Sequence, residues 1–351
     1  MLRRVRSIAL GLMLGLVLSG LSTAVAPAGA STRQAKAPVT LRLGYFPNVT
    51  HATAIVGVEG RIFEDKVGKG VKLELSTFSA GPAAIEALFS DALDATYVGP
   101  NPTINAYAQS HGDAVRIISG ATSGGAFLVV KKSIRTAKDL KGKVLASPQL
   151  GNTQDVALRS WLKSKGLSTD TSGGGDVSIR PQDNALTLQA FEQGDIDGAW
   201  VPEPWATRLV TEGGGKVLVD ERTLWPHGRY VTTQLIVRTD FLKAHRDVVK
   251  RLLAGQVAAN DFLAMNRKAA EKLVAKGIEN ITGTAIAPEL VTASFDHLTF
   301  TDDPIASSLR ASAKAAVKVG LLDPVDLSGL YDLRLLNAVL KKTGEPTVSA
   351  K

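Results

Sequence analysis

The sequence contains no cysteine in 351 residues. Disulfide-stapled domains and enzymes with a thiol nucleophile are therefore excluded. The motifs GxSxG, HExxH and CxxC, which mark common hydrolases, metalloproteases and redox or zinc sites, are also missing. The five histidines are scattered along the chain, and none has the spacing of a metal ligand pair. We expect a protein without a metal, without a cofactor and without enzymatic activity.

Phosphate and nucleic-acid binding signals are weak as well. The run Gly213-Gly214-Gly215-Lys216 is followed by Val217, where a phosphate-binding loop needs Ser or Thr. Aromatic residues make up 5% of the chain, and no dense Lys/Arg cluster is interleaved with them. The net charge of +8 falls to +5 without residues 1–30, which is mild for a chain of this size. We expect no nucleic-acid partner.

The N-terminus has the pattern of a secretory signal peptide. Three arginines precede the apolar run IALGLMLGLVLSGL, and Ala28-Gly29-Ala30 offers a small-residue cleavage site near Ala30. The run is short and interrupted by glycine, although an uncleaved anchor stays the alternative. Leu21 stands where a lipidated cysteine would be needed, so we expect a soluble periplasmic or secreted protein without a lipid anchor. Residues 31–37 predict a disordered polar leader.

From Val39 onward the pattern alternates strands with helices, which is typical of an α/β fold. VTLRLGYF, VKLELSTF and DALDATYVG predict strands, and HATAIVGVEGRIF and GPAAIEALFS predict the helices between them. Later helices are expected over 244–266, 267–276, 288–296, 304–320 and 328–342. Two longer strand-like stretches, 123–133 and 229–242, connect the halves of the pattern. Two strands that join two lobes would form a hinge with a cleft beside it.

The second half of the pattern resembles the first at an offset of 103 residues. With this offset, AIEALFSDALDATYVGPNP lies opposite TLQAFEQGDIDGAWVPEPW, and Asp94 lies opposite Asp197. Few identities support the alignment, so two interpretations stay open: an internal repeat, or two βαβ units that obey the same rules. In both cases polar loops follow the strands of each half, at the edge where open α/β sheets bind ligands.

The most informative of these loops is GNTQ, between a predicted strand and the helix DVALRSWL. Gly151 lets a ligand approach the backbone closely, and Asn152 or Thr153 can cap the helix. Thr153 and Gln154 add a hydroxyl and an amide. Free N–H groups and the helix dipole favour an anion here without a formal positive charge. Plain capping, with water outside, is the alternative.

Other predicted helix starts carry similar groups. NVTH contains Asn48, Thr50 and His51, and for His51 a binding role and a capping role are equally open. Ser79 and Gly81 precede a helix with proline in its first turn. Asn101 in GPNP is expected to make a polar contact. In the matching loop, Trp205 either forms an apolar wall or packs on its own helix, and Glu203 is expected to sit at a helix start, paired with Arg208.

Six stretches together resemble substrate-binding proteins of ABC importers, in the aliphatic sulfonate, nitrate and taurine group. They are GYFPNVTHATAIVG, FSAGPAAIEALFS, ATYVGPNPTINAY, SPQLGNTQDVALRSWL, GDIDGAWVPEPWATRL and VTTQLIVRTDFLKAH. The resemblance covers nearly all of 39–342 and is strongest to sulfonate-binding members. It implies a type II periplasmic-binding-protein fold, with lobe I from 38–124 and 233–342, lobe II from 125–232, and a flexible tail at 343–351.

The resemblance further implies a receptor that captures a small organic anion, a sulfonate such as taurine, and delivers it to a membrane permease with its ATPase. It places the ligand-binding groups in the loops above, including the Glu203-Pro204-Trp205 segment, on a monomeric protein. Nitrate, bicarbonate and a thiamine-precursor pyrimidine are alternative ligands. An enzyme on the same fold, such as a menaquinone-pathway lyase or the pyrimidine synthase, is the alternative from another class. The export signal argues against a cytosolic enzyme.

Overall fold

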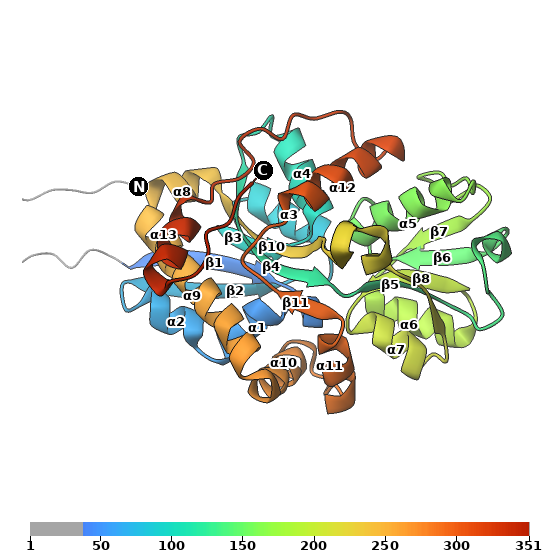
Figure 1. The fold of residues 1–351 in the computed structure, drawn as a ribbon, viewed down its shortest axis with the longest axis horizontal. Helices are drawn as coiled ribbons and strands as arrows, with labels where there is room; N and C mark the ends of the chain where they lie inside the picture. The colour runs from blue at the N-terminus through green and yellow to red at the C-terminus, as the bar shows by residue number, and fades with distance from the viewer. Residues whose placement is uncertain (1–37, 351) are drawn as a thin grey trace, which may run out of the picture. The chain divides into compact units, whose positions relative to one another are not determined.

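The structure of this protein is a computed structural model that describes residues 38–350. The expected signal peptide and leader lie outside these residues. The described chain builds two mixed α/β sheets, one of six strands in the order β11-β4-β10-β3-β1-β2 and one of five in the order β7-β6-β8-β5-β9 (Figure 1). We call the first sheet with its helices lobe I and the second lobe II. This architecture confirms the expected fold class.

Lobe I begins with two βα units. Strands β1 (Val39–Tyr45) and β2 (Val71–Thr77) pair in parallel, and β1 also pairs in parallel with β3 (Ala95–Val98). β4 (Val115–Gly124) and β10 (Val231–Arg238) run antiparallel to their neighbours, and short β11 (Leu298–Phe300) closes the edge. Leu41 and Leu43 of β1 are fully buried, as the alternation of the sequence predicts.

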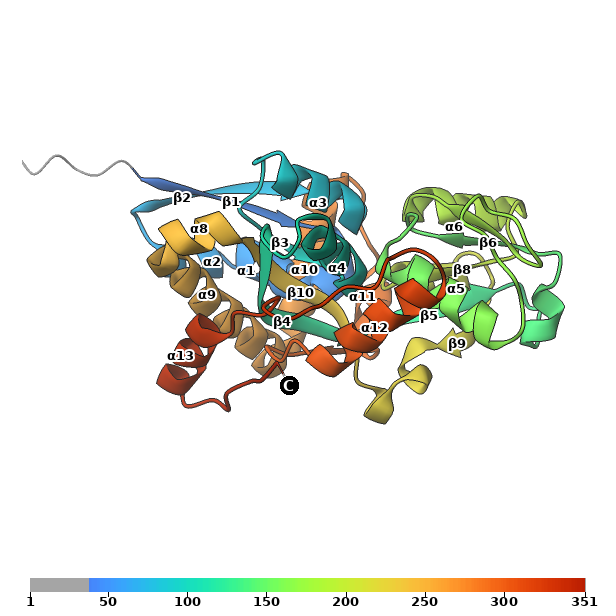
Figure 2. The ribbon, with the colours of Figure 1, turned by 90° about the horizontal axis from the view of Figure 1, so that it is seen from above.

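Helices cover both faces of this sheet. On one face lie α1 (Ala52–Glu59), α2 (Ile62–Val67), α9 (Arg246–Met265), α10 (Arg267–Thr282), α11 (Pro288–Phe295) and α13 (Arg334–Thr343). The other face carries α3 (Gly81–Phe89), α4 (Pro100–Gln109) and α12 (Ala306–Lys318). The short α8 (Thr239–Ala244) follows β10. Figure 2 shows α3 and α4 on the side opposite α9.

Lobe II repeats the plan at smaller size. Its sheet contains β5 (Ala126–Val130), β6 (Val144–Ser147), β7 (Ser178–Pro181), β8 (Gly198–Pro202) and β9 (Lys216–Asp220). Helix α5 (Thr153–Ser164) packs on one face, and α6 (Asn184–Gln193) and α7 (Trp205–Thr211) pack on the other (Figure 1). Helix α5 turns Leu158, Trp161 and Leu162 toward the core, the amphipathic spacing of a surface helix.

The structure favours the internal repeat over coincidence. The strand order β2-β1-β3-β10 of lobe I matches β7-β6-β8-β5 of lobe II, with the last strand antiparallel in both. The starts of α3 and α6, Gly81 and Asn184, differ by the same 103 residues as the aligned loops. Asp94 and Asp197 also make the same contacts: Asp94 Oδ2 accepts from the Arg42 N–H at 2.8 Å, and Asp197 Oδ2 accepts from the Val144 N–H at 3.0 Å. Each of these aspartates directly precedes one strand, and its carboxylate accepts from a backbone N–H of the parallel strand beside it.

The chain crosses between the lobes twice. β4 passes directly into β5 through Gly124 and Gly125, which have φ of +87° and +73°. A Cβ on Gly125 would lie 2.2 Å from a Leu298 methyl group, so only glycine fits. The second crossing leads from β9 through the short 3-10 helices Glu221–Leu224 and Pro226–Gly228 into β10. Thr232 Oγ1 donates to Gly124 O at 2.6 Å, so the two crossings are hydrogen-bonded to each other.

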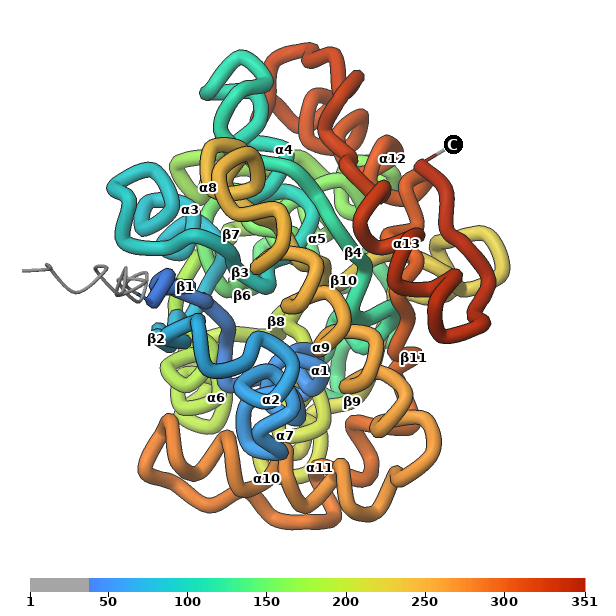
Figure 3. The backbone as a smooth tube through the Cα atoms, turned by 90° about the vertical axis from the view of Figure 1, so that its left-hand side faces the viewer, coloured from blue at the N-terminus to red at the C-terminus, as the bar shows by residue number. Residues whose placement is uncertain are grey.

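The C-terminal segment differs from the flexible tail that we expected. Glu345 N–H donates to Leu340 O, and Val348 exchanges two hydrogen bonds with the Asn337 side chain. Arg310 also donates to Ala350 O at 2.9 Å. The segment therefore runs back along lobe I, as the red end of the tube in Figure 3 shows. No helix among residues 38–350 is long and apolar enough to cross a bilayer.

Candidate functional site

A small cavity lies where the two lobes face each other, and we call it the polar cavity. Its volume is about 30 Å³, room for a small anionic group at most. Its walls come from the loop after β1, the starts of α3, α4, α5 and α6, and strand β10. It is lined by Phe46, Asn48, Thr50, His51, Ser79, Ala80, Gly81, Gly99, Pro102, Pro148, Asn152, Thr153, Gln154, Asn184, Pro202, Thr232 and Thr233.

Helix N-termini converge on this cavity from both lobes. The first turns of α3 and α4 arrive from lobe I, and those of α5 and α6 from lobe II. Each first turn has backbone N–H groups without intrahelical partners, although Pro100 and Pro102 leave α4 fewer of them, and the helix dipole places partial positive charge there. Among residues 38–350, no Lys, Arg, Asp or Glu lines the cavity. The polar cavity therefore suits one negative charge, held by donors and dipoles rather than by a counter-ion.

The α5 loop is held rigidly beneath the cavity. Asn152 caps α5 by accepting from the Asp155 N–H at 2.9 Å. The Asp155 carboxylate accepts in return from the Gly151 N–H at 2.9 Å, the Ser147 hydroxyl at 2.7 Å and Arg159 Nε at 3.0 Å. All these acceptor contacts are buried or partly buried, so the loop is fixed before a ligand arrives.

Two polar side chains at the cavity have a group without a partner. Among the described residues, the buried Thr153 Oγ1 and Asn184 Oδ1 form no hydrogen bond within the protein. Buried polar groups nearly always have partners, so such groups indicate a ligand or an ordered water. The Thr153 hydroxyl can donate a hydrogen bond to a ligand. If the Asn184 carboxamide is rotated by 180°, its NH2 group takes the position of its oxygen and can donate as well. Since Asn152 caps α5, the Thr153 hydroxyl is not needed as a cap and can bind a group in the polar cavity.

His51 is an uncharged member of the wall. It is buried and stacks on Phe46 with ring centroids 4.3 Å apart. Burial lowers the pKa of His51 to about 3, so the ring is neutral at physiological pH. Its Nδ1 accepts from the Phe46 N–H at 3.4 Å, which leaves the proton on Nε2.

The sequence-derived residues divide into two groups. The residues that line the polar cavity are Asn48, Thr50, His51, Ser79, Gly81, Asn152, Thr153 and Gln154. Asn101, Gly151 and the segment Glu203-Pro204-Trp205 do not line it. Asn101 accepts instead from the Ser312 hydroxyl at 2.7 Å, and the Gly151 N–H is occupied by Asp155. Their role in ligand binding stays a prediction.

Glu203 lies at the start of α7, as expected, where its carboxylate accepts from the Thr207 N–H at 3.1 Å, but it does not pair with Arg208. Its buried carboxylate accepts from the Thr207 hydroxyl at 2.9 Å and from Ser294 at 3.3 Å, and His297 Nδ1 lies 2.6 Å away. Arg208 pairs instead with Glu212 at 2.8 Å. The Glu203 N–H donates to Gly125 O, beside the first crossing. The expected Arg208 pairing was wrong because lobe I, far away in sequence, supplies nearer partners.

Trp205 makes the polar contact between lobes that sequence patterns could not show. Its indole Nε1 donates to Asn48 Oδ1 at 2.9 Å, and Arg208 lies over its ring at 5.0 Å. Trp205 thus packs on its own helix and also reaches the loop after β1. Of the two roles that the sequence left open, the structure shows packing on its own helix, and Trp205 does not line the polar cavity.

Asn184 was missed, although a signal existed. At the offset of 103 residues it lies opposite Gly81, which we had selected. Applying the repeat in both directions would have found it. Thr232 and Thr233 were missed because a polar pair inside a strand has no distinctive spacing.

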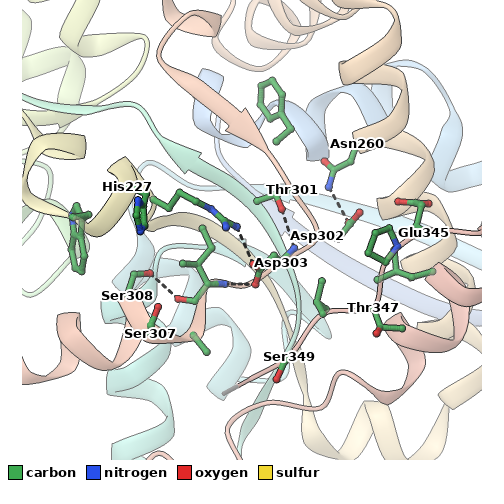
Figure 4. A pocket seen from close by; sticks show the side chains of 18 of the residues that line it. His227, Asn260, Thr301, Asp302, Asp303, Ser307, Ser308, Glu345, Thr347 and Ser349 are labelled. Atoms are coloured by element: carbon green, nitrogen blue, oxygen red, sulfur yellow. Dashed lines mark hydrogen bonds and ion pairs between the residues drawn. The ribbon is translucent and has the colours of Figure 1, made fainter.

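A much larger cavity lies elsewhere and has the wrong charge for an anion. This open groove of about 810 Å³ lies between α9, α12 and the C-terminal segment (Figure 4). Asp302, Asp303 and Glu345 face it, and burial raises the pKa of Asp302 to about 6. Arg229 is already paired with Asp303 at 3.0 Å. Among the described residues, no cluster of His, Cys, Asp or Glu could hold a metal ion.

Comparisons with known proteins agree with this geometry. The NMT1-like family matches residues 34–279. The chain belongs to the NMT1-like family. It is 30% identical to the taurine-binding periplasmic protein of Escherichia coli K12 over 190 residues. This matched region is 54% of this chain and 57% of that protein. The chain thus spans little more than half the length of this curated relative. The resemblance to the taurine and sulfonate group is confirmed at this level.

Solved structures show the fold. The alkanesulfonate-binding protein SsuA from Xanthomonas axonopodis pv. citri, bound to MOPS, has a TM-score of 0.71 and 21% identity over 85% of this chain and all of that chain. The periplasmic nitrate-binding protein NrtA from Synechocystis PCC 6803 has a TM-score of 0.71 and 14% identity, over 88% of this chain and 90% of that chain. The NMT1-like chain therefore has the periplasmic-binding-protein fold.

The Trp205–Asn48 contact generates a test by double-mutant cycle. Trp205→Phe keeps most of the ring but removes the N–H donor, and Asn48→Ala removes the acceptor. A neutral hydrogen bond contributes roughly 1 kcal/mol, so each change should weaken binding of methanesulfonate by about fivefold or more in calorimetry. We expect the double variant to lose clearly less than the sum. Strict additivity would show that the contact is not formed in the bound state.

Proposed function

We propose that this protein is an extracytoplasmic receptor of an ABC importer that binds the sulfonate group of a small organic anion between its lobes. The observation that supports this most is the convergence of four helix N-termini from both lobes on an uncharged cavity, where the Thr153 hydroxyl and the Asn184 amide oxygen have no partner. A sulfonate is a monoanion whose three oxygens accept from several donors at once. A dianion would bring a second charge with no counter-ion.

The receptor role rests on the division of donors between the lobes. Lobe I contributes the loop after β1 and the start of α3, and lobe II contributes the starts of α5 and α6. An anion that touches both lobes binds the closed state better than an open one, and only this difference can drive closure. The closed shape is then what a membrane permease with its ATPase would recognise. The signal-peptide pattern is consistent with export to the periplasm or medium as a monomer without a lipid anchor.

Nitrate is the second candidate ligand, because the polar cavity is small. A planar monoanion of four atoms would fit a volume of about 30 Å³ and use the same donors. Calorimetry with methanesulfonate, taurine, nitrate and bicarbonate separates the candidates. We expect the two sulfonates to bind and the inorganic anions to bind at least roughly tenfold more weakly. Tighter binding of nitrate would contradict the sulfonate proposal, and turnover of any ligand would contradict a receptor.

The Thr153 hydroxyl provides the most direct mutational test. Thr153→Val keeps the branched shape but removes the donor, and Thr153→Ser keeps the donor as a matched control. Leaving a charged acceptor short of one donor costs about 1–3 kcal/mol, so methanesulfonate affinity should fall roughly 5- to 150-fold in the valine variant alone. The thermal midpoint without ligand should change little, because Asn152 caps the helix. Equal affinities in wild type and Thr153→Val would remove Thr153 from the site.

The pKa of His51 predicts how binding depends on pH. Because burial holds this pKa at about 3, the ring stays neutral and its protonation state does not change between pH 5 and 8. We therefore expect the dissociation constant of methanesulfonate to be flat over this range. A protonated histidine with an ordinary pKa would instead make affinity fall about tenfold per unit above pH 6.5. That steep loss, abolished in His51→Gln, would show that His51 acts as a counter-ion.

A further inference from the structure

A second cavity adjoins the polar cavity, and we call it the apolar pocket. Its volume is about 250 Å³, and it lies between α5 of lobe II and α12 of lobe I. Its apolar lining residues include Val156, Trp161, Trp225 and Tyr230. Trp225 and Tyr230 stack with ring centroids 5.5 Å apart, so this part of the wall is rigid. Rigid aromatic walls between two lobes are typical of small-molecule sites.

The two cavities are separated by little more than one side chain. Thr153 lines both of them. The neighbouring pairs Gly99–Pro100 and Val231–Thr232 each place one residue on either cavity. A Cβ on Gly99 would lie 2.3 Å from Thr153 Oγ1, so the absent side chain is what leaves room for the hydroxyl at this boundary. The same Oγ1 has no hydrogen-bond partner. A group that binds Thr153 in the polar cavity therefore stands at the entrance to the apolar pocket.

The charge of the apolar pocket restricts what can enter it. Within the part of the chain that the structure describes, Glu221 is the only acidic residue in its wall, and no Lys or Arg lines it. The Glu221 carboxylate is buried and accepts from Trp200 Nε1 at 2.7 Å and Trp225 Nε1 at 3.3 Å, without a cationic partner among its contacts. A second anion would meet this carboxylate in apolar surroundings. An ammonium group would meet both the carboxylate and aromatic faces, which attract cations.

We propose that the apolar pocket receives the organic tail of the anion whose headgroup occupies the polar cavity, and that it selects neutral or cationic tails over anionic ones. The substrate class is then a monoanionic organosulfonate with an extended tail, rather than the smallest sulfonates or a disulfonate. This inference rests on the proposed function, because the headgroup must first bind at Thr153. Burial raises the pKa of Glu221 to about 7, and a cationic tail would favour its ionised form.

The open groove of Figure 4 is a less suitable place for the tail. None of its lining residues lines the polar cavity, whereas it shares Trp225 and Ser308 with the apolar pocket. A tail that starts at Thr153 would therefore reach the apolar pocket first. The groove can be tested separately, because Ala264 lines it without lining either of the other cavities.

The test is calorimetry of the full chain with four sulfonates: methanesulfonate, pentane-1-sulfonate, 4-aminobutane-1-sulfonate and 4-sulfobutanoate. Each buried methylene adds several-fold in affinity, so pentanesulfonate should bind at least about tenfold more tightly than methanesulfonate. The amine should bind at least as tightly as pentanesulfonate, and 4-sulfobutanoate at least about tenfold more weakly. In Glu221→Gln the difference between amine and carboxylate tails should shrink to less than about threefold.

Filling variants locate the tail. Ala157→Phe on α5 and Ala315→Phe on α12 fill the apolar pocket from opposite lobes, and Ala264→Phe is the matched control in the groove. The affinity ratio of pentanesulfonate to methanesulfonate should collapse to near one in either filled variant and stay at the wild-type value in the control. If one filled variant does not fold, the other gives the answer.

The failures of the two proposals are distinguishable. If the wild-type protein binds none of the four sulfonates, the proposed function fails. If methanesulfonate binds but the ratio is near one in the wild type, or survives both filling variants, the tail does not use the apolar pocket. A ratio that collapses in Ala264→Phe would place the tail in the groove and overturn the inference. Equal binding of 4-sulfobutanoate and pentanesulfonate would overturn the selection against anionic tails.

Discussion

The proposed function depends on one physical constraint: a single negative charge must be held between two lobes without a positive side chain. The polar cavity meets this constraint with helix N-termini, hydroxyls and amides, and none of its walls carries a formal charge. Dipoles of this kind are fixed by the fold, so they need no reorganisation when the anion arrives. They are also individually weak, which is why donors from both lobes are needed together. Closure follows from that requirement.

The internal repeat explains how two lobes come to present matching donors. Because the same strand order recurs, the matching strands β1 and β6 each end in a loop whose residues line the polar cavity. Asp94 and Asp197 each accept from the backbone of that strand, β1 or β6, so the two sheets are anchored in a similar way. Gly124 and Gly125 then allow the chain to cross where a side chain would collide with Leu298 or the backbone of His297. The buried Glu203 beside this crossing links α7 to lobe I.

Sequence reasoning reached the elements and part of the site. Strand alternation predicted β1 through Leu41 and Leu43, and the GNTQ loop was recognised because its polar residues precede an amphipathic helix. The local signals could not show which of these residues face inward. Asn101 is occupied by Ser312, 211 residues away, a contact that depends on tertiary packing. The Gly151 N–H is occupied by the nearby Asp155, a local contact that the helix-start pattern did not indicate. Glu203 was assigned to Arg208 because neighbours in sequence are visible, whereas His297 is 94 residues away. The apolar pocket lies between helices from different lobes, so no single stretch of sequence encodes it.

The central claim is that an anion closes the lobes, and small-angle X-ray scattering with and without methanesulfonate tests it most directly. Contacts such as Trp205 to Asn48 join the lobes in the structure described here. We expect the free protein in solution to have a larger radius of gyration than this closed arrangement. Saturating methanesulfonate should reduce it to the closed value, with no product formed over hours. Tight binding with an unchanged radius of gyration would contradict the account.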